Sequence, residues 1–200
     1  MTGPGQEIPL FPLRTVLFPG GVLPLRIFEA RYIDMIRRCL RAESGFGVVL
    51  IESGVEAGGA ASVHDVGTLA DIVDFTRHDD GLLGVTATGR CRFRIVAARQ
   101  ERDGLNVGQV EWLEEGPERE LPVDFDPFAA LLRQALPQLG AAYQHLEERY
   151  GDAAWVAGRL AELLPLSLED KQRCLELGDP LSRLELLRPM IRISTATRTR

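Results

Sequence analysis

The sequence predicts an α+β fold, with short strands around one prominent helix in the first part and a small α-helical bundle in the second. β-branched runs and turn signals fill residues 8–113, a single helical apolar period interrupts them, and helix start and stop signals dominate after residue 117. Two hundred residues suffice for one compact domain or for two small subdomains. We expect a strand-rich subdomain at 1–116 and a helical subdomain at 117–200.

The first segments are rich in proline and aromatic residues. Leu10-Phe11-Pro12-Leu13 and Leu17-Phe18-Pro19-Gly20-Gly21 contain more of both than a paired central strand tolerates. Such a segment lines a groove or presents a strand edge to an extended peptide. It can equally pack the base of a barrel, and we favour this packing interpretation.

One amphipathic helix is expected between Phe28 and Ala42. Its apolar residues recur at steps of three and four, while arginines and Asp34 take the other side, so one face is buried and the other is solvated. The apolar positions are Phe28, Tyr32, Met35, Ile36, Cys39 and Leu40.

Strand signals follow this helix. Residues 47–51 form a short β-branched run of the kind buried on both sides. Residues 68–75 and 82–88 should pair, because Asp80-Gly81 between them favours a tight hairpin turn. A second turn, Asp103-Gly104, leads into 106–113, and the Gly- and Ala-rich residues 54–61 are expected to form a flexible loop.

A row of arginines is the most visible polar feature of the strand-rich part. Arg90, Arg92 and Arg94 alternate with Cys91, Phe93 and Ile95, so three guanidinium groups are expected on one side of a strand. Paired guanidinium donors can bind carboxylate or phosphate. We favour the alternative, a solvated strand face paired with Asp71, Asp74 or Glu111.

The second part reads as four or five helices. Pro137 and Gly140 should split the first of them, and residues 195–200 should fray. Leu184, Leu187 and Ile191 lie on one face of the last helix. The start signals are Asp126-Pro127, Gly151-Asp152, the capping box of Ser167 to Asp170, and Asp179-Pro180.

The residues that carry enzyme chemistry are scattered. His64, His78 and His145 are isolated, and the three cysteines Cys39, Cys91 and Cys174 fit neither a disulfide framework nor a metal knuckle. There is no Gly-x-Ser-x-Gly elbow and no glycine-rich phosphate loop. We therefore predict a protein that is not an enzyme and that holds neither cofactor nor metal.

Ser167 and Lys171 combine the residue types of a catalytic Ser-Lys dyad. Ser167 is already expected to cap a helix, and Lys171 is expected to point into solvent, without the burial that lowers a lysine pKa. The capping interpretation is therefore preferred.

Charge and hydropathy restrict the partners and the compartment. The net charge of -6 divides into -4 over residues 1–116, with 12 arginines against 16 acids, and -2 over the remainder, with 11 basic residues against 13 acids. Neither half is basic, so nucleic acid is disfavoured as a partner. No apolar run is long enough to cross a membrane and the first ten residues lack a signal pattern, so we expect a cytoplasmic protein without membrane contact.

The order of several motifs resembles the amino-terminal domain of Lon proteases. The opening match comprises Ile8-Pro9-Leu10-Phe11-Pro12-Leu13-Arg14, Val16-Leu17-Phe18-Pro19-Gly20, Leu23-Pro24-Leu25, Ile27-Phe28-Glu29 and Arg31-Tyr32. Later matches are Phe46-Gly47-Val48-Val49, Val66-Gly67-Thr68-Leu69-Ala70, Gly89-Arg90-Cys91-Arg92-Phe93, Leu166-Ser167, Lys171-Gln172, Leu175-Glu176 and Arg183-Leu184. The resemblance covers about residues 8–190. It implies a PUA-like pseudobarrel of strands followed by a helical bundle.

The resemblance also implies a function. In Lon proteases this domain engages substrates, whereas ATP hydrolysis and peptide cleavage reside in later domains, so the proteolytic activity is not carried over to this chain. The first hypothesis is a module that recognises unfolded or extended polypeptides, as an adaptor for a protease or chaperone. The alternative is an RNA- or nucleotide-binding PUA-like protein. The sequence leaves the oligomeric state open. The candidate binding residues are Phe18, Pro19, Leu25, Phe28, Tyr32, Arg90, Arg92 and Arg94.

Overall fold

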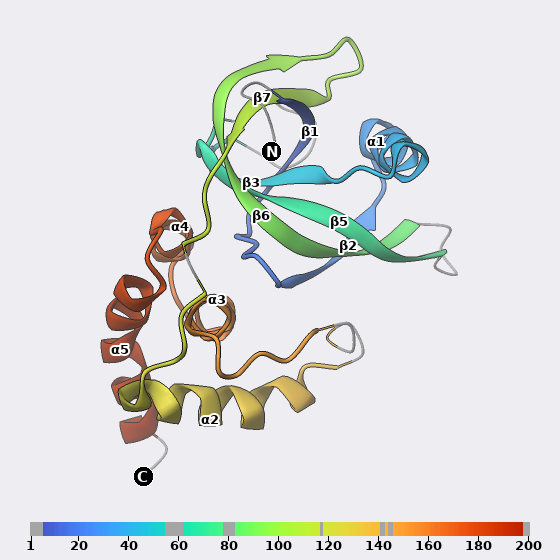
Figure 1. Cartoon of the computed structure of the whole chain (residues 1–200). Helices are drawn as coiled ribbons and strands as arrows, with labels where there is room; N and C mark the ends of the chain where they lie inside the picture. The colour runs from blue at the N-terminus through green and yellow to red at the C-terminus, as the bar shows by residue number, and fades with distance from the viewer. Residues whose placement is uncertain are drawn as a thin grey trace. The chain divides into compact units, whose positions relative to one another are not determined.

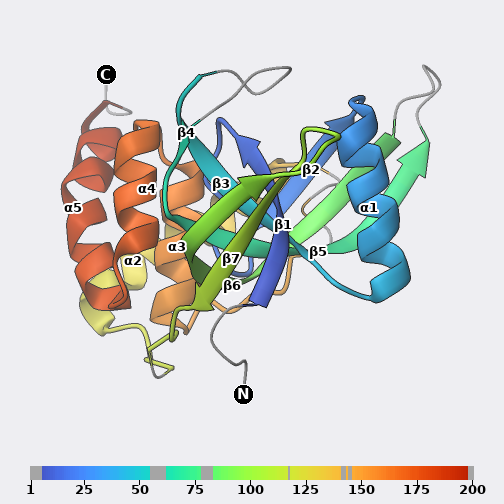
Figure 2. The same cartoon turned by 90° about the horizontal axis from the view of Figure 1, so that it is seen from above.

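The computed structural model (Figure 1, Figure 2) describes residues 6–54, 62–77, 83–116, 118–140, 143 and 146–197. The chain forms two compact units, Met1–Glu114 and Glu115–Arg200. The first consists of strands and one helix, and the second is helical. The structure therefore has the mixed α and β composition expected from the sequence. The functional division at residue 116 stays a prediction.

The strands of the first unit form a sheet that closes on itself. Its hydrogen-bonded order is β1-β7-β6-β5-β3-β4, and an additional pairing between β1 and β3 completes a ring. Strand β2 lies outside this ring and pairs with β6. The strands are β1 (Gln6–Leu13), β2 (Val22–Ile27), β3 (Phe46–Ser53), β4 (Ser62–Val63), β5 (Val66–Arg77), β6 (Leu83–Gln100) and β7 (Asn106–Trp112).

Strand β1 pairs with two strands, although its proline content argued against a paired central strand. It pairs with β7 from Gln6 to Leu10 and with β3 from Leu10 to Leu13. Pro9 therefore lies in the part paired with β7, and Pro12 in the part paired with β3. Each proline has one neighbouring strand, as in an edge strand, where its missing N–H is tolerated.

The segment between β1 and β2 packs into the sheet through a tight turn. The Gly21 N–H donates to the Phe18 carbonyl at 2.9 Å, and Gly20 has a φ of 72°. Proline followed by a glycine with positive φ is the signature of a type II turn. The turn docks on Gly89 of β6, because Gly20 N–H donates to the Gly89 carbonyl at 2.7 Å and Gly89 N–H donates to the Gly21 carbonyl at 2.9 Å. The packing interpretation of this segment is thus confirmed.

Helix α1 (Ala30–Ala42) covers the core of this unit. Tyr32, Met35, Ile36 and Cys39 are buried in one cluster with side chains from the strands, as the apolar spacing predicted. Phe28 lies before the helix, which starts after Glu29. Burial raises the pKa of the Cys39 thiol, consistent with packing rather than reactivity.

Two predicted hairpins are present in the sheet. Strand β5 pairs along its length with residues 83–94 of β6, although Asp80-Gly81 lies outside the described residues, as does most of the predicted loop at 54–61. The segments expected at 82–88 and 90–95 form one continuous strand, β6. At the second hairpin, Gly104 has a φ of 85° and the Leu105 N–H donates to the Asp103 carboxylate at 3.0 Å.

The described residues of the second unit form four α-helices. Helix α3 contacts each of the other three (Figure 1). Their boundaries are α2 (Asp126–Ala135), α3 (Ala153–Leu163), α4 (Leu168–Glu176) and α5 (Pro180–Thr197). That these helices form one bundle stays a prediction.

The helix boundaries follow most of the predicted signals. Asp152 accepts from the Ala154 N–H at 2.9 Å, and Ser167 accepts from the Asp170 N–H at 3.0 Å. Asp179 accepts from the Ser182 N–H at 2.9 Å. Helix α2 stops at Ala135, two residues before Pro137, as expected. Helix α5 instead continues to Thr197, so residues 195–197 are helical rather than frayed, and residues 198–200 lie outside the described residues.

Candidate functional site

The end of the ribbon formed by β2, β6 and β5 carries a group of accessible hydrophobic residues. Leu25, Val85 and Phe75 are direct neighbours across the three strands, so their side chains lie in one row. Val85 is buried, Leu25 is half-buried and Phe75 is 61% exposed. The row is therefore buried at its centre, Val85, and most exposed at Phe75.

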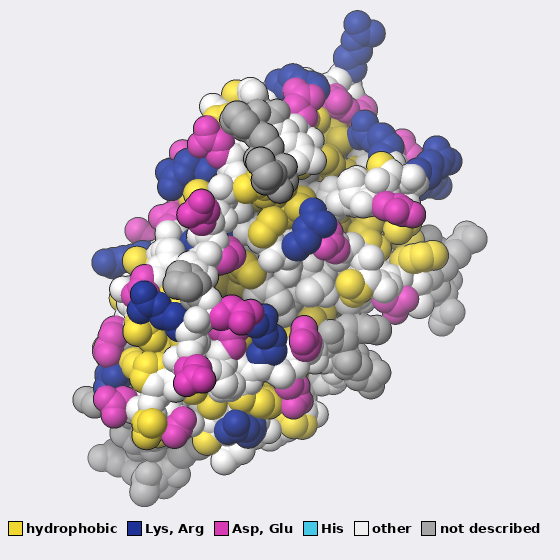
Figure 3. Space-filling view, viewed as in Figure 1, with side chains coloured by type: hydrophobic (Ala, Val, Ile, Leu, Met, Phe, Trp, Pro, Cys, Tyr) yellow, Lys and Arg dark blue, Asp and Glu magenta, His cyan; other side chains and the backbone are white. Residues whose placement is uncertain are grey.

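Further hydrophobic residues extend this surface. Leu83 and Ile72 are half-buried against the core, Val73 is 46% exposed, and Phe28 directly after β2 is 63% exposed. We call these residues, together with Leu25 and Phe75, the apolar end of the ribbon. Hydrophobic side chains are visible alongside β5 in the space-filling view (Figure 3). Contiguous accessible apolar surface on a folded protein often marks a binding site.

Two of the predicted aromatic site residues belong to the core. Phe18 has 0% exposure, and Tyr32 has 4% exposure with its ring stacked on Phe11 at 4.1 Å between centroids. Neither can contact a ligand at the surface, so their prediction as binding residues is corrected. Pro19 is half-buried in the turn that docks on Gly89. Leu25 and Phe28 are therefore the members of the predicted apolar set that lie at the apolar end.

The three arginines of the row do not form one exposed surface. Arg90 and Arg94 are exposed, and Arg90 lies 3.4 Å from the Asp71 carboxylate, as the solvated-face interpretation expects. Arg92 has 1% exposure and donates to the Glu114 carbonyl at 3.3 Å. The chain leaving β7 covers it, since the Leu113 N–H donates to the Arg92 carbonyl at 3.0 Å. The arginine row, one of the two features that motivated the RNA-binding alternative beside the PUA-like architecture, therefore does not form a continuous exposed surface.

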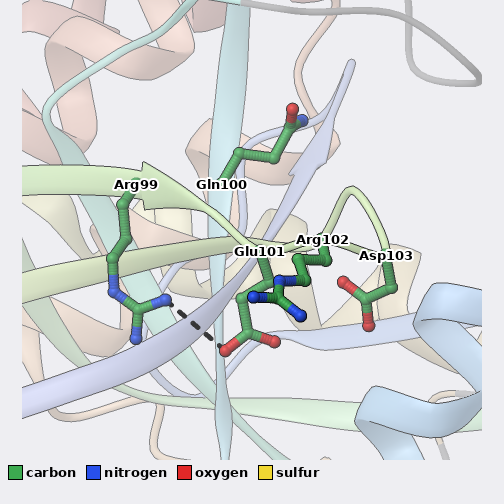
Figure 4. A pocket seen from close by; sticks show the side chains of 5 residues that line it. All are labelled: Arg99, Gln100, Glu101, Arg102 and Asp103. Atoms are coloured by element: carbon green, nitrogen blue, oxygen red, sulfur yellow. Dashed lines mark ion pairs between the residues drawn. The ribbon is translucent and has the colours of Figure 1, made fainter.

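A shallow pocket lies at the hairpin between β6 and β7. It has a volume of about 510 Å³ and is lined by Arg99, Gln100, Glu101, Arg102 and Asp103 (Figure 4). Glu101 pairs with Arg99 at 3.5 Å and with Arg38 at 3.2 Å. The hydrogen bond from Arg99 to Glu7, together with the charge of Glu7, raises the pKa of the Arg99 guanidinium above its ordinary value. Because its main charges already have protein partners, this pocket is a weak candidate for a ligand.

Ser167 and Lys171 do not face one another. The Ser167 hydroxyl donates to the Asp170 carboxylate at 2.7 Å, whereas the Lys171 amine donates to the Glu162 carbonyl at 2.6 Å. Lys171 is half-buried, and burial lowers its pKa despite the opposing charge of Glu162. The expectation that Lys171 points into solvent is therefore wrong. It binds a carbonyl of the last turn of α3, a favourable place for a cation.

Metal-binding clusters and membrane-spanning helices are absent from the described residues. In that part of the chain no three His, Cys, Asp or Glu side chains are arranged to hold a metal ion. His78 and His145 lie outside it. No helix in the described ranges is long and apolar enough to cross a membrane.

The two units define an α+β protein in which a closed sheet precedes a set of helices. Residues 7–192 match the model of the ATP-dependent protease La (LON) substrate-binding domain, and the chain belongs to this family. The resemblance deduced from the sequence motifs is thereby confirmed.

The similar proteins include two Lon proteases. Lon protease 2 of Myxococcus xanthus is 30% identical over 190 residues, which are 91% of this chain and 23% of that protein. The Lon protease of Escherichia coli strain K12 is 30% identical over 92% of this chain and 24% of its own length. The chain thus spans less than a quarter of these relatives. Protein cereblon of Danio rerio is 33% identical over 67% of this chain and 30% of its own.

Solved structures share the fold. The Lon N-terminal domain protein from Xanthomonas campestris superimposes with a TM-score of 0.75 and 40% identity, covering 92% of this chain and 98% of its own. The N-terminal domain of the Mycobacterium avium complex Lon protease gives a TM-score of 0.58 at 19% identity, with 92% and 97% coverage. The second likeness concerns the fold alone.

Sequence reasoning missed four residues of the apolar end, namely Ile72, Val73, Phe75 and Leu83. The available signal was the loose alternation of residues 68–75, which ends in an aromatic residue. The sequence does not reveal that β3 pairs with β5 only from Thr68 to Ala70. Beyond Ala70, β5 pairs with β6 but no longer with β3, and its side chains Val73 and Phe75 are exposed.

Proposed function

We propose that this chain is a polypeptide-recognition module without catalytic function, and that it binds apolar side chains of unfolded or extended polypeptides at the apolar end of the ribbon. The exposure of Phe28, Val73 and Phe75 at this one end carries the proposal. Folded proteins rarely gather large apolar side chains at the surface without a use for them.

The energetics of such a surface suit reversible binding. Complete burial of a phenylalanine side chain contributes about 1.5–3 kcal/mol. Phe75 and Phe28 are 61% and 63% exposed, so a ligand that covers either ring gains part of this amount. About 1–2 kcal/mol for each ring corresponds to roughly a tenfold effect on affinity. Several contacts of this size give moderate affinity with little dependence on ligand sequence.

The family match supports the same function, because the matching model describes a substrate-binding domain. We propose by extension that the chain acts in protein quality control, as a cytoplasmic adaptor that brings polypeptides to a protease or chaperone. Under this proposal, 1–116 forms a PUA-like barrel that provides the binding surface, and 117–200 forms a supporting helical bundle. RNA is then not a ligand.

The test is binding of a chemically unfolded, fluorescently labelled model protein, followed by fluorescence anisotropy. Phe75→Ser and Phe28→Ser should each weaken binding about tenfold. Val123→Ser is the matched control, because Val123 is 80% exposed but belongs to the helical unit. The proposal is contradicted if the wild-type protein shows no binding, or if all three substitutions weaken binding equally.

A further inference from the structure

The outer edge of β5 lacks a neighbouring strand beyond Ala70. Strand β6 pairs with β5 up to Arg77, whereas the pairing with β3 ends at Ala70. Among the described residues, the stretch from Asp71 to Arg77 therefore has one unpaired edge. An open edge that carries exposed apolar side chains is a template for pairing with another strand. Val73 and Phe75 are exposed side chains of this kind.

The Asp74 side chain already accepts a hydrogen bond from one backbone N–H of this edge. The Phe75 N–H donates to the Asp74 carboxylate at 2.8 Å. Because this N–H bonds to a side chain rather than to β6, we assign it to the outer edge of the strand. A register shift between Ile72 and Asp74 adds an irregularity at the same place. A charged side chain and a bulge are two devices that protect strand edges from association.

The opposite edge of the ribbon has its own protection. Strand β2 pairs with β6 and with no other strand in the described part of the chain. Pro24 stands in its middle, opposite Thr86, and proline offers no N–H to an added strand. Both edges of the ribbon thus carry features that hinder the addition of another strand next to the apolar end.

Self-pairing of β5 depends on Asp74 in a second way. If two copies pair as antiparallel strands about Asp74, Val73 of each copy faces Phe75 of the other, which is a favourable apolar pair. The same register places the two Asp74 carboxylates directly opposite one another. Like charges in directly opposed positions destabilise a strand pair. The edge is therefore self-complementary except at Asp74.

We infer that Asp74 blocks an otherwise competent interface between two copies of this chain, the antiparallel pairing of their β5 edges. The carboxylate acts twice, by holding the Phe75 N–H and by repelling its counterpart in the second copy. This inference goes beyond the proposed function and does not depend on it, because the occupant is a second copy and not a polypeptide ligand.

The experiment compares molar mass by light scattering across a concentration series. Asp74→Ala should raise the average mass toward twice the wild-type value as concentration increases. Asp124→Ala removes an exposed carboxylate in the helical unit and should behave as the wild type. Adding Val73→Lys to Asp74→Ala should restore the wild-type mass, because the new charge lies opposite Phe75 of the second copy.

Hydrogen exchange at the Phe75 amide provides an independent readout at low concentration. Asp74→Ala should accelerate this exchange, whereas Asp74→Asn should retain protection, because the asparagine side-chain oxygen still accepts. If Asp74→Ala does not fold, as judged by circular dichroism, the mass of Asp74→Val decides the matter, since it lacks both the opposed charges and the acceptor for the Phe75 N–H. Wild-type mass for every folded Asp74 variant, or a dimer that Val73→Lys leaves intact, overturns the inference.

Discussion

Replacing Gly89 with alanine should destabilise the sheet unit strongly. A Cβ at this position would overlap the carbonyl oxygen of Phe18 and would lie 3.1 Å from the Thr68 side chain. The turn must then move away, and the two hydrogen bonds between Gly89 and the segment Gly20-Gly21 are strained or lost. Each bond is worth about 1 kcal/mol, and overpacking adds at least about 1 kcal/mol. The expected loss in the free energy of unfolding is about 3 kcal/mol.

Urea denaturation can measure this loss in the unit concerned. Trp112 belongs to the sheet unit and Trp155 to the helical unit, so Trp112 fluorescence in a Trp155→Phe background reports the sheet unit. Gly151→Ala is the matched control, because a Cβ at Gly151 meets nothing within 4 Å, and it should change stability by less than about 0.5 kcal/mol. A Gly89→Ala protein as stable as this control would refute the described docking of the turn.

Three further predictions concern individual side chains. Phe18→Ala should cost about 3–5 kcal/mol in urea unfolding, whereas Phe28→Ala should change stability by less than about 0.5 kcal/mol, and similar values for the two would contradict their opposite burial. Burial lowers the pKa of Lys171 in the folded protein, so the unfolded chain holds this proton more tightly. The free energy of unfolding of the wild type, measured relative to Lys171→Met, should therefore rise with pH between the lowered pKa of the folded state and the ordinary value of 10.5. If urea unfolding shows the same pH dependence for the two proteins, this prediction is wrong. Burial raises the thiol pKa of Cys39 and Cys174, so iodoacetamide should modify the half-buried Cys91 first, and mass spectrometry that finds equal labelling would argue against this packing.

Helix α1 shows what local sequence patterns can specify. Its apolar spacing predicted the helix and its four buried residues, because one amphipathic period depends only on neighbours three and four positions away. The caps at Asp152 and Ser167 were predicted for the same reason. Each of these features is decided within one turn of chain. Two further positions of the predicted apolar face are not buried, since Leu40 is 42% exposed and Phe28 lies before the helix.

Features that depend on distant strands could not be predicted in this way. Arg92 alternates with apolar residues as an exposed side chain would, yet the chain after β7 covers it. Pro9 and Pro12 are tolerated because β1 changes partners at Leu10, which only the assembled sheet reveals. Phe75 lies at the surface because β3 pairs no further than Ala70. Non-local pairing therefore decides which candidate site residues are accessible.

Site-specific photo-cross-linking tests the proposed function most directly. A photoreactive phenylalanine analogue at position 75 keeps an aromatic ring at the apolar end, and the same analogue at position 123 samples the exposed surface of the helical unit. With an unfolded model protein as the ligand, position 75 should give the cross-linked product and position 123 should give little. Equal yields at the two positions, or no product at position 75, would contradict recognition of polypeptides at the apolar end.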